Sequence, residues 1–293
     1  TSLVDELENA KPDLVLSGFD IGANFAVTVA AAHMNIPVAH IQGGEVTGSI
    51  DESIRHAMSK FSHIHFPATE LSKDRLIRMG EKPDNIYVVG CPSIDVLMDT
   101  KKIDKKIIEK YFNIDFKKPV VLMIQHPVTT EYGKSFDQIV QTVDAIKELK
   151  LQAIVLLPNN DAGHKQIIDH ITSSDLKWFP SLPSEIFVNL YRNVSLLVGN
   201  SSSGIHETPS LSIPAINVGN RQYGRERADN VIDVSYDKNE IKEAIKKGLY
   251  DKKFIKAVKN IKNPYGEGNS AKKIVRILKN VSLENLIQKH FYD

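Results

Sequence analysis

The chain has little of several features that would define a specialised class of protein. Cys91 is the only cysteine among 293 residues, so the sequence can form neither a disulfide framework nor a cysteine-rich metal site. No apolar run approaches the ~18 residues that span a bilayer. With 37 Lys and Arg against 36 Asp and Glu, the net charge of +1 offers nucleic acid or an anionic membrane no general attraction. We therefore expect a cytoplasmic protein with no nucleic-acid or membrane partner.

What is present is an ordinary globular composition, 42% hydrophobic and 25% charged, which suffices for a sizeable core. Short apolar runs alternate with helical segments, a pattern typical of parallel doubly wound α/β sheets. A Lys-rich stretch around residues 98–118 separates two blocks of strands. We predict an N-terminal Rossmann-like domain (1–105) that lacks its opening strands, a nucleotide-binding Rossmann-like domain (106–262) and C-terminal helices (263–293). A ligand would bind between the first two domains.

The periodicity of apolar residues predicts the individual elements. Strands are expected at 14–17, 38–41, 63–66, 86–89, 120–124, 153–157, 178–179, 195–198 and 213–218. Helices are expected at 21–35, 51–60, 70–79, 136–149, 162–172, 185–192, 238–248, 271–279 and 283–289. Beyond residue 231 the pattern is mostly helical.

The stretch at 194–225, VSLLVGNSSSGIHETPSLSIPAINVGNRQYGR, carries the clearest functional signal. A buried strand runs into the turn Gly199–Gly204, which opens a helix, and a second apolar run leads to Arg221. At the carboxyl end of such a strand, backbone N–H groups and the helix dipole favour an anion, and the serine hydroxyls add donors. A phosphate or diphosphate would fit there. The alternative is a plain helix cap, since Ser, Asn and Gly are also the usual capping residues.

Reactive side chains follow four of the predicted strands, where functional groups of such folds collect. They are Asp20, the segment Gln42 to Glu45, the pair Gln125-His126 and the segment Asn159 to Asp161, and Asp51 opens the next helix after Glu45. Each has a structural alternative: the two Asp residues could cap helices, His126 could be a packed loop histidine and Glu45 a solvated loop acid. No group of His and acidic residues has metal-site spacing, so we expect no metal.

Taken together, several motifs resemble those of one known family. They are HIQGGEVTGSIDESIRH at 40–56, QHPVTT at 125–130, PNNDAG at 158–163, GNSSSG at 199–204, RQYGR at 221–225 and YGEG at 265–268. Over nearly the whole chain the sequence is similar to the hydrolysing UDP-N-acetylglucosamine 2-epimerases of sialic-acid synthesis. The resemblance implies a GT-B-like fold of two Rossmann-like domains around a UDP-sugar. It also implies a reaction that needs no cofactor: UDP is eliminated with loss of the C2 proton, and the glycal is hydrated to an N-acetylmannosamine-type sugar.

The resemblance also implies roles for particular residues. Those matching catalytic positions are Asp20, Asp51, His126 and Gln42. Those matching substrate-binding positions are His126 and Asn159 beside the nucleotide, Leu182 facing the uracil, Ser201 and Ser202 at the diphosphate, Glu207 at the ribose, and Arg221 at the nucleotide. A homo-oligomer, a dimer or tetramer, is expected as well.

The sequence departs from the family pattern in four places. The opening strand with its diphosphate-contacting loop is absent, Ile21 stands where an Arg is expected, and the amide of Gln42 replaces a carboxylate. Pro209 predicts a short or kinked helix after the Gly199–Gly204 turn. The first three favour a second hypothesis, a UDP-binding module without turnover. A third hypothesis, a GT-B glycosyltransferase, would need an acceptor site, and the sequence identifies none.

Overall fold

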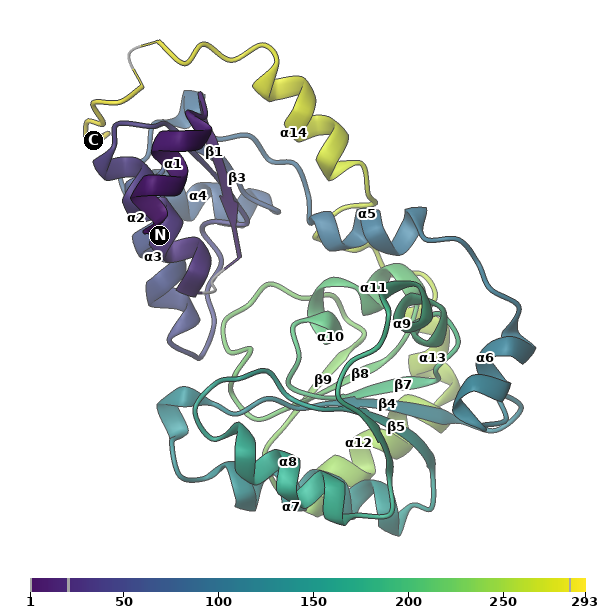
Figure 1. Ribbon diagram of the computed structural model, residues 1–293. Coiled ribbons are helices and arrows are strands. Elements are labelled where there is room, and N and C mark those ends of the chain that lie inside the picture. The colour runs from purple at the N-terminus through teal and green to yellow at the C-terminus, as the bar shows by residue number, and fades with distance from the viewer. Residues whose placement is uncertain (1, 20–21, 285) are drawn as a thin grey trace. The chain divides into compact units, whose positions relative to one another are not determined.

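The structure is a computed structural model that describes residues 2–19, 22–284 and 286–293. The chain forms two compact units. Unit 1 comprises residues 1–95 with 265–293, so the last segment of the chain returns to the N-terminal unit, and unit 2 comprises residues 96–264. In Figure 1 unit 1 carries the purple and yellow ends of the colour scale and unit 2 the teal and green middle.

Unit 2 is built on a six-stranded parallel sheet in the order β6-β5-β4-β7-β8-β9. The strands are β4 (Val120–Ile124), β5 (Gln152–Leu156), β6 (Lys177–Phe179), β7 (Leu196–Gly199), β8 (Ala215–Val218) and β9 (Val231–Val234). The helices are α6 (Lys105–Phe112), η2 (Thr129–Glu131), α7 (Ser135–Glu148), α8 (His164–Ser173), α9 (Ser184–Tyr191), α10 (Ser203–His206), α11 (Thr208–Leu211), α12 (Lys238–Tyr250) and α13 (Lys252–Val258). Helices α7, α8 and α12 cover one face of the sheet, and α9, α10 and α11 lie over the other (Figure 1).

The central strand β4 shows why the sheet is covered on both faces. Its five residues are all buried. Val121 and Met123 belong to an apolar cluster that also contains residues of α7 and α12, whereas Leu122 belongs to the opposite cluster, with residues of α6 and α9. Side chains alternate across a strand, so an uninterrupted apolar run is stable only between two helical layers. Each such side chain stabilises the fold by about 1.5–3 kcal/mol relative to exposure.

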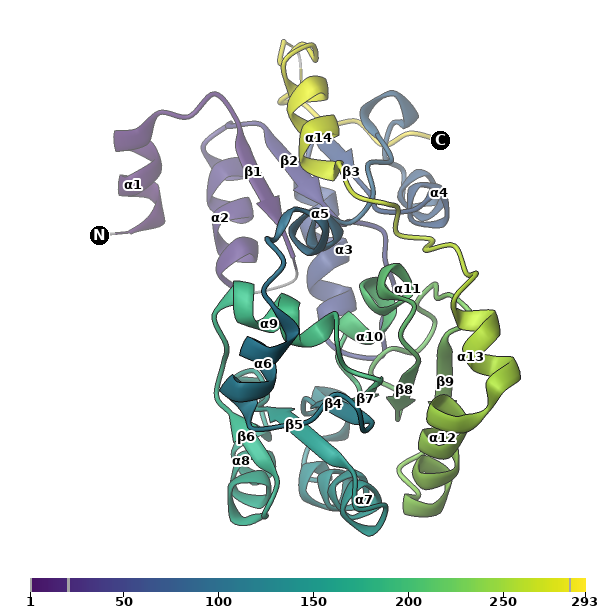
Figure 2. The same cartoon turned by 90° about the vertical axis from the view of Figure 1, so that its right-hand side faces the viewer.

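Unit 1 contains a three-stranded parallel sheet in the order β1-β2-β3, seen side by side in Figure 2. Its elements are α1 (Leu3–Ala10), β1 (Val15–Gly18), α2 (Gly22–His33), β2 (Val38–Ile41), α3 (Asp51–Phe61), β3 (Ile64–Phe66), α4 (Glu70–Arg78), η1 (Pro83–Asn85) and α14 (Ser270–Leu278). Helix α5 (Pro92–Asp99) crosses the division between the units. Ile274 of α14 packs with Ala39, Ile64 and Phe66, which anchors the C-terminal segment to this sheet.

The structure confirms most of the predicted elements and corrects several. The apolar run at 86–89 is not a strand, since Ile86 makes only an isolated bridge to His65. The described part of 283–289 is not helical, and Val231–Val234 is a strand. Helices α5, α6 and α13 were not predicted. Pro209 acts as expected, because the segment after the turn divides into α10 and α11, each of four residues. Within the described residues, no helix combines the length and apolarity needed to span a bilayer.

Candidate functional site

The candidate site of unit 2 begins where β4 and β7 end side by side, with Ile124 paired to Gly199. Gly199 has a φ of +132°, and a Cβ there would lie 2.0 Å from the carbonyl oxygen of Ile124. No side chain fits that position, so glycine is required for the two strand ends to meet. The turn after β7 is thereby brought against the loop after β4.

Asn200, fully buried, joins these two loops. Its Oδ1 accepts a hydrogen bond from the backbone N–H of His126 at 2.7 Å, and its Nδ2 donates to the His126 carbonyl at 2.8 Å. The Asn200 carbonyl in turn accepts hydrogen bonds from Gln222 Nε2 at 2.8 Å and Arg221 Nη1 at 3.4 Å. One residue thus sets the positions of three loops that follow β4, β7 and β8.

The ring of His126 is neutral and has a defined tautomer. Burial, and then the charge of Arg221, lowers its pKa to about 3, against the opposing effect of its hydrogen bond with Asn159. Nδ1 accepts that hydrogen bond from the Asn159 backbone N–H at 3.1 Å, so the proton of the neutral ring lies on Nε2. His126 therefore offers an uncharged N–H donor at the strand ends.

Arg221 supplies the positive charge of this region. Its side chain is 12% exposed, and Nη2 lies 4.0 Å from Asp161 Oδ2. Asp161 also accepts a hydrogen bond from Asn159 Nδ2 at 2.6 Å. A guanidinium beside a neutral imidazole donor is suited to an anionic ligand such as a phosphate.

The serines of the turn lie at the start of α10. Ser201 Oγ accepts hydrogen bonds from the backbone N–H of Ser203 at 3.3 Å and from its hydroxyl at 3.0 Å. Ser202 stands at the N-cap position, yet its side chain makes no capping hydrogen bond. A capping role therefore explains part of the contacts of Ser201. It does not explain the hydroxyl of Ser202.

Glu207 lies at the junction of α10 and α11, where Pro209 follows. Among the described residues, its buried Oε2 has no hydrogen-bond partner. Burial, and then the carboxylate of Glu207, raises the pKa of Tyr191, so the two side chains are near each other. A buried carboxylate oxygen without a donor is a natural acceptor for ligand hydroxyls. Leu182 is half-buried after β6 and packs against the apolar cluster below α9.

Unit 1 has a second set of polar side chains, in the tight loop after β2. Gln42 has a φ of +60°, and its Nε2 donates to Glu45 Oε1 at 3.3 Å and to Cys91 Sγ at 3.2 Å. Glu45 is only 3% exposed, so the idea of a solvated loop acid is wrong. Gly44 has a φ of +81°, and a Cβ there would lie 2.2 Å from the carbonyl oxygen of Ser72. The loop is thus closely fitted to α4.

Asp51 is the first residue of α3 and accepts a hydrogen bond from Ser49 Oγ at 2.8 Å. The N-cap position is occupied by Ile50, which cannot cap with its side chain, so Asp51 is not the capping residue. One turn later, Arg55 Nη1 donates to the Glu45 carbonyl at 2.9 Å. Helix α3 therefore connects Asp51 to the loop that carries Gln42. Asp20 lies outside the described residues, as does Ile21.

Comparison with known proteins decides the family. The family model described as UDP-N-acetylglucosamine 2-epimerase matches residues 1–279. The chain belongs to this family. It is 38% identical over 284 residues to the hydrolysing UDP-N,N'-diacetylbacillosamine 2-epimerase of Legionella pneumophila, covering 96% of this chain and 74% of that protein. It is 34% identical over 255 residues to a UDP-N-acetylglucosamine 2-epimerase of Neisseria meningitidis serogroup B, covering 86% of this chain and 67% of the relative.

A solved structure of the family has the same architecture. The UDP-N-acetylglucosamine 2-epimerase of Neisseria meningitidis bound to UDP-N-acetylglucosamine superposes with a TM-score of 0.82 and 30% identity, covering 95% of this chain and 79% of that one. The α/β class with parallel sheets and the GT-B-like family of two Rossmann-like domains are thereby confirmed.

The structure brings some of the predicted residues together. In unit 2, His126, Asn159 and Arg221 are connected directly or through one residue. Ser201 and Ser202 lie in the adjacent turn, Glu207 lies between α10 and α11, and Leu182 lies in a different loop, between β6 and α9. Within the described residues, no group of three His, Cys, Asp or Glu side chains could hold a metal ion.

Sequence reasoning missed the residues that hold others in place. Asn200 and Gln222 orient the unit 2 loops, and Arg55 holds the loop of unit 1. His40 was overlooked as well: burial, and then the charges of His65 and Arg55, lowers its pKa to about 3. The position of Asn200 inside the glycine-serine turn was visible in the sequence, but the partner of its side-chain amide, His126, lies 74 residues away.

Proposed function

We propose that the protein is a hydrolysing 2-epimerase that converts UDP-N-acetylglucosamine, or a related UDP-acetamido sugar, into UDP and the free sugar inverted at C2. The family supports epimerase chemistry on UDP-sugars. Relatives named hydrolysing, such as that of Legionella pneumophila, support the hydrolytic outcome. The same family also contains relatives whose names do not specify hydrolysis.

The observation that carries the proposal is the Asn200-centred arrangement of His126 and Arg221. Nε2–H of the neutral His126 and the guanidinium of Arg221 bind the diphosphate, with Ser201 and Ser202 supplying hydroxyl donors. Glu207 accepts from the ribose hydroxyls through its buried carboxylate oxygen. Leu182 contacts the uracil. Hydrogen bonds to charged groups are worth ~1.5–3 kcal/mol each, so several of them together supply the ~8 kcal/mol that micromolar affinity requires.

The acid–base chemistry belongs to unit 1. In the first half-reaction a carboxylate takes the C2 proton, the C2–H electrons form the C1=C2 bond of the glycal, and UDP leaves with the bonding pair of the C1–O bond. In the second, an acid returns a proton to the opposite face of C2, while the oxygen of water adds to C1 and gives up its proton to a base. Asp20 and Asp51 exchange these protons, and His126 assists at the departing diphosphate. Gln42 acts through its amide as a hydrogen-bonding group, because an amide cannot exchange protons as a carboxylate does.

The test is to incubate the protein with UDP-N-acetylglucosamine and with a UDP-diacetamido sugar and to follow the phosphorus and sugar NMR signals. Appearance of free UDP together with a free N-acetylmannosamine-type sugar supports the proposal. Appearance of a UDP-linked epimer would indicate a non-hydrolysing epimerase. UDP binding without any conversion would favour a nucleotide-binding module. The cytoplasmic location and the homo-oligomer stay predictions.

A further inference from the structure

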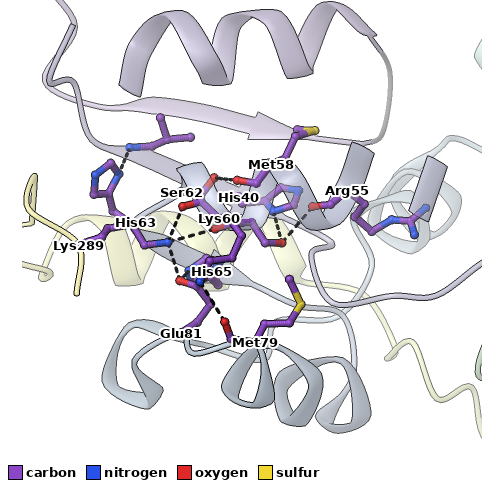
Figure 3. A network of polar contacts seen from close by, with 12 residues as sticks. His40, Arg55, Met58, Lys60, Ser62, His63, His65, Met79, Glu81 and Lys289 are labelled. Atoms are coloured by element: carbon purple, nitrogen blue, oxygen red, sulfur yellow. Dashed lines mark hydrogen bonds and ion pairs between the residues drawn. The ribbon is translucent and has the colours of Figure 1, made fainter. Parts of the chain in front are cut away.

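The C-terminal segment of unit 1, residues 286–293, contributes Lys289 to an ionic cluster around the buried carboxylate of Glu81 that the proposed site does not use. Figure 3 shows Lys289, Lys60 and His65 converging on Glu81. The segment is fixed further by a hydrogen bond from the Tyr292 backbone N–H to the Gly80 carbonyl at 3.0 Å. These contacts fix the position of the segment within unit 1.

Lys289 caps the C-terminal end of α3. Its Nζ donates to the carbonyl oxygens of Ser59 at 3.2 Å and Lys60 at 3.0 Å, both in the last turn of α3. The last four carbonyls of a helix have no partner within the helix, and a cation is favoured beside them. Lys289, from the far end of the sequence, therefore completes the helix that begins with Asp51.

Glu81 fixes Lys289 at this position. The carboxylate is 2% exposed and lies 2.6 Å from Lys289 Nζ, 2.7 Å from Lys60 Nζ and 3.0 Å from His65 Nε2. Burial alone would raise the pKa of Glu81, but hydrogen bonds from His65, Lys289 and Lys60 lower it to about 2. The carboxylate is thus charged, and a buried charge is stable only while its partners stay in place.

The hydroxyl of Ser59 connects α3 to the polar side chains of the candidate site in unit 1. Its hydroxyl lies 3.1 Å from Nδ1 of the fully buried His40 and donates to the Arg55 carbonyl at 3.1 Å. Arg55 in turn holds the Glu45 carbonyl at 2.9 Å. Figure 3 shows this side of the network beside the Lys289 contacts. Polar contacts therefore run without a break from the C-terminal segment to the loop after β2.

We propose that Lys289 is a positioning residue for the reaction. Glu81 holds Lys289, and Lys289 caps the C-terminal end of α3, which fixes the helix that places Asp51 and the loop of Gln42 and Glu45. This inference rests on the proposed function. Proton transfer at carbon is sensitive to geometry, and a misplacement of ~1 Å can lower the rate ~100-fold. Nucleotide affinity should be insensitive to Lys289, because the residues proposed to bind UDP belong to unit 2.

The experiment compares Lys289→Met and Lys289→Arg with the unsubstituted protein, and uses Lys279→Met as the control at an exposed lysine before the segment. We expect Lys289→Met to lower kcat by ~10-fold or more, with the inhibition constant of UDP unchanged. Lys289→Arg, which keeps a cation at the helix end, should recover most of the loss. Lys279→Met should behave like the unsubstituted protein.

Ser59→Ala is a second, milder variant, which can be measured if Lys289→Met fails to fold. It removes the hydroxyl that contacts His40 and keeps the carbonyl that Lys289 caps. A lower kcat with unchanged UDP inhibition, and a non-additive effect when both substitutions are combined, support the inference. If the unsubstituted protein turns over and both variants keep its kcat, or if UDP inhibition weakens in parallel with kcat, the inference is overturned. Absence of turnover in the unsubstituted protein would instead refute the proposed function.

Discussion

Asn200 and His126 hold each other through two reciprocal hydrogen bonds, from His126 N to Asn200 Oδ1 at 2.7 Å and from Asn200 Nδ2 to the His126 carbonyl at 2.8 Å. The pair spans the ends of two adjacent strands, β4 and β7. A side-chain amide can satisfy both backbone groups at once, whereas a carboxylate can only accept. The nucleotide site proposed here therefore depends on a residue that need not contact the ligand.

Asn200→Asp tests this dependence. The new carboxylate still accepts from His126 N–H, but it faces the His126 carbonyl with no proton to donate, which displaces the loop. We expect the dissociation constant of UDP to rise ~10-fold or more, corresponding to ~1.4 kcal/mol or more. Isothermal calorimetry measures it, with Asn260→Asp at an exposed helix end as the control. Equal affinity in all three proteins would refute the role of Asn200.

Arg221→Ala removes the cation whose charge acts on His126. Loss of a charge-assisted hydrogen bond is worth ~1.5–3 kcal/mol, so UDP should bind roughly tenfold or more weakly. Glu207→Ala should weaken UDP as well, and should affect a 2'-deoxyribose analogue less if Glu207 binds the ribose hydroxyls. Arg276→Ala, an exposed arginine of α14, serves as the control. Unchanged UDP affinity in both Arg221→Ala and Glu207→Ala would show that the nucleotide binds elsewhere.

Asp51→Asn tests the acid–base assignment in unit 1. The substitution keeps the shape of the side chain and its acceptance of the Ser49 hydrogen bond, but removes proton exchange. Loss of a general acid or base typically lowers the rate ~10²–10⁴-fold, and we expect a fall of this size in kcat. Asp84→Asn, at a surface aspartate of the same unit, is the matched control. Normal turnover by Asp51→Asn would remove Asp51 from the mechanism.

His40 makes unit 1 sensitive to acid. Its pKa is about 3 in the folded protein and 6.5 when unperturbed, so the unfolded chain binds the proton first as the pH falls. The stability that depends on neutral His40 is complete above pH 6.5 and is lost as the pH falls towards 3. At ~1.4 kcal/mol for each unit of pKa, this amounts to roughly 4–5 kcal/mol at most.

Urea unfolding at several pH values between 7 and 4 measures this effect. The free energy of unfolding should decrease with falling pH, and the decrease should be shallower in His40→Asn, because asparagine does not titrate. His33→Asn, at an exposed histidine, should keep the original slope. If His40→Asn kept it too, the acid sensitivity would have another source.

The sequence predicted the elements whose stability is local or depends on an uninterrupted apolar run. Val120–Ile124 is a strand with the expected bounds, because an unbroken run of five apolar residues suits a parallel strand that is covered on both faces. Val38–Ile41 is also a strand with the expected bounds, although the buried His40 interrupts its apolar residues. The run at 86–89 looks equally apolar and donates backbone hydrogen bonds to His65 and Pro67, yet its pairing amounts to an isolated bridge between Ile86 and His65. Val231–Val234 is a partly exposed outer strand that was missed although three of its four residues are β-branched, because an Asp interrupts a run of only four residues.

The candidate site was predictable from the sequence where the residue type marks a turn, but not where a role depends on distant contacts. Turn residues at strand ends are recognisable by residue type, as at Gly199–Gly204, where the backbone of Gly199 requires a glycine. The roles of Asn200, Arg55 and Lys289 depend on contacts between segments far apart in the sequence, which local patterns do not encode. The burial of Glu45 is of the same kind, since it results from the fit of one loop against another helix.

Hydrolytic epimerisation is tested most directly by isotope labelling. The protein is incubated with UDP-N-acetylglucosamine in H₂¹⁸O and, separately, in D₂O, and the products are analysed by mass spectrometry and NMR. The proposed elimination and hydration predict unlabelled UDP and a free sugar inverted at C2, with ¹⁸O on C1 in the first solvent and deuterium on C2 in the second. Recovery of only UDP-linked sugar, or of free sugar with unexchanged hydrogen at C2, would contradict it.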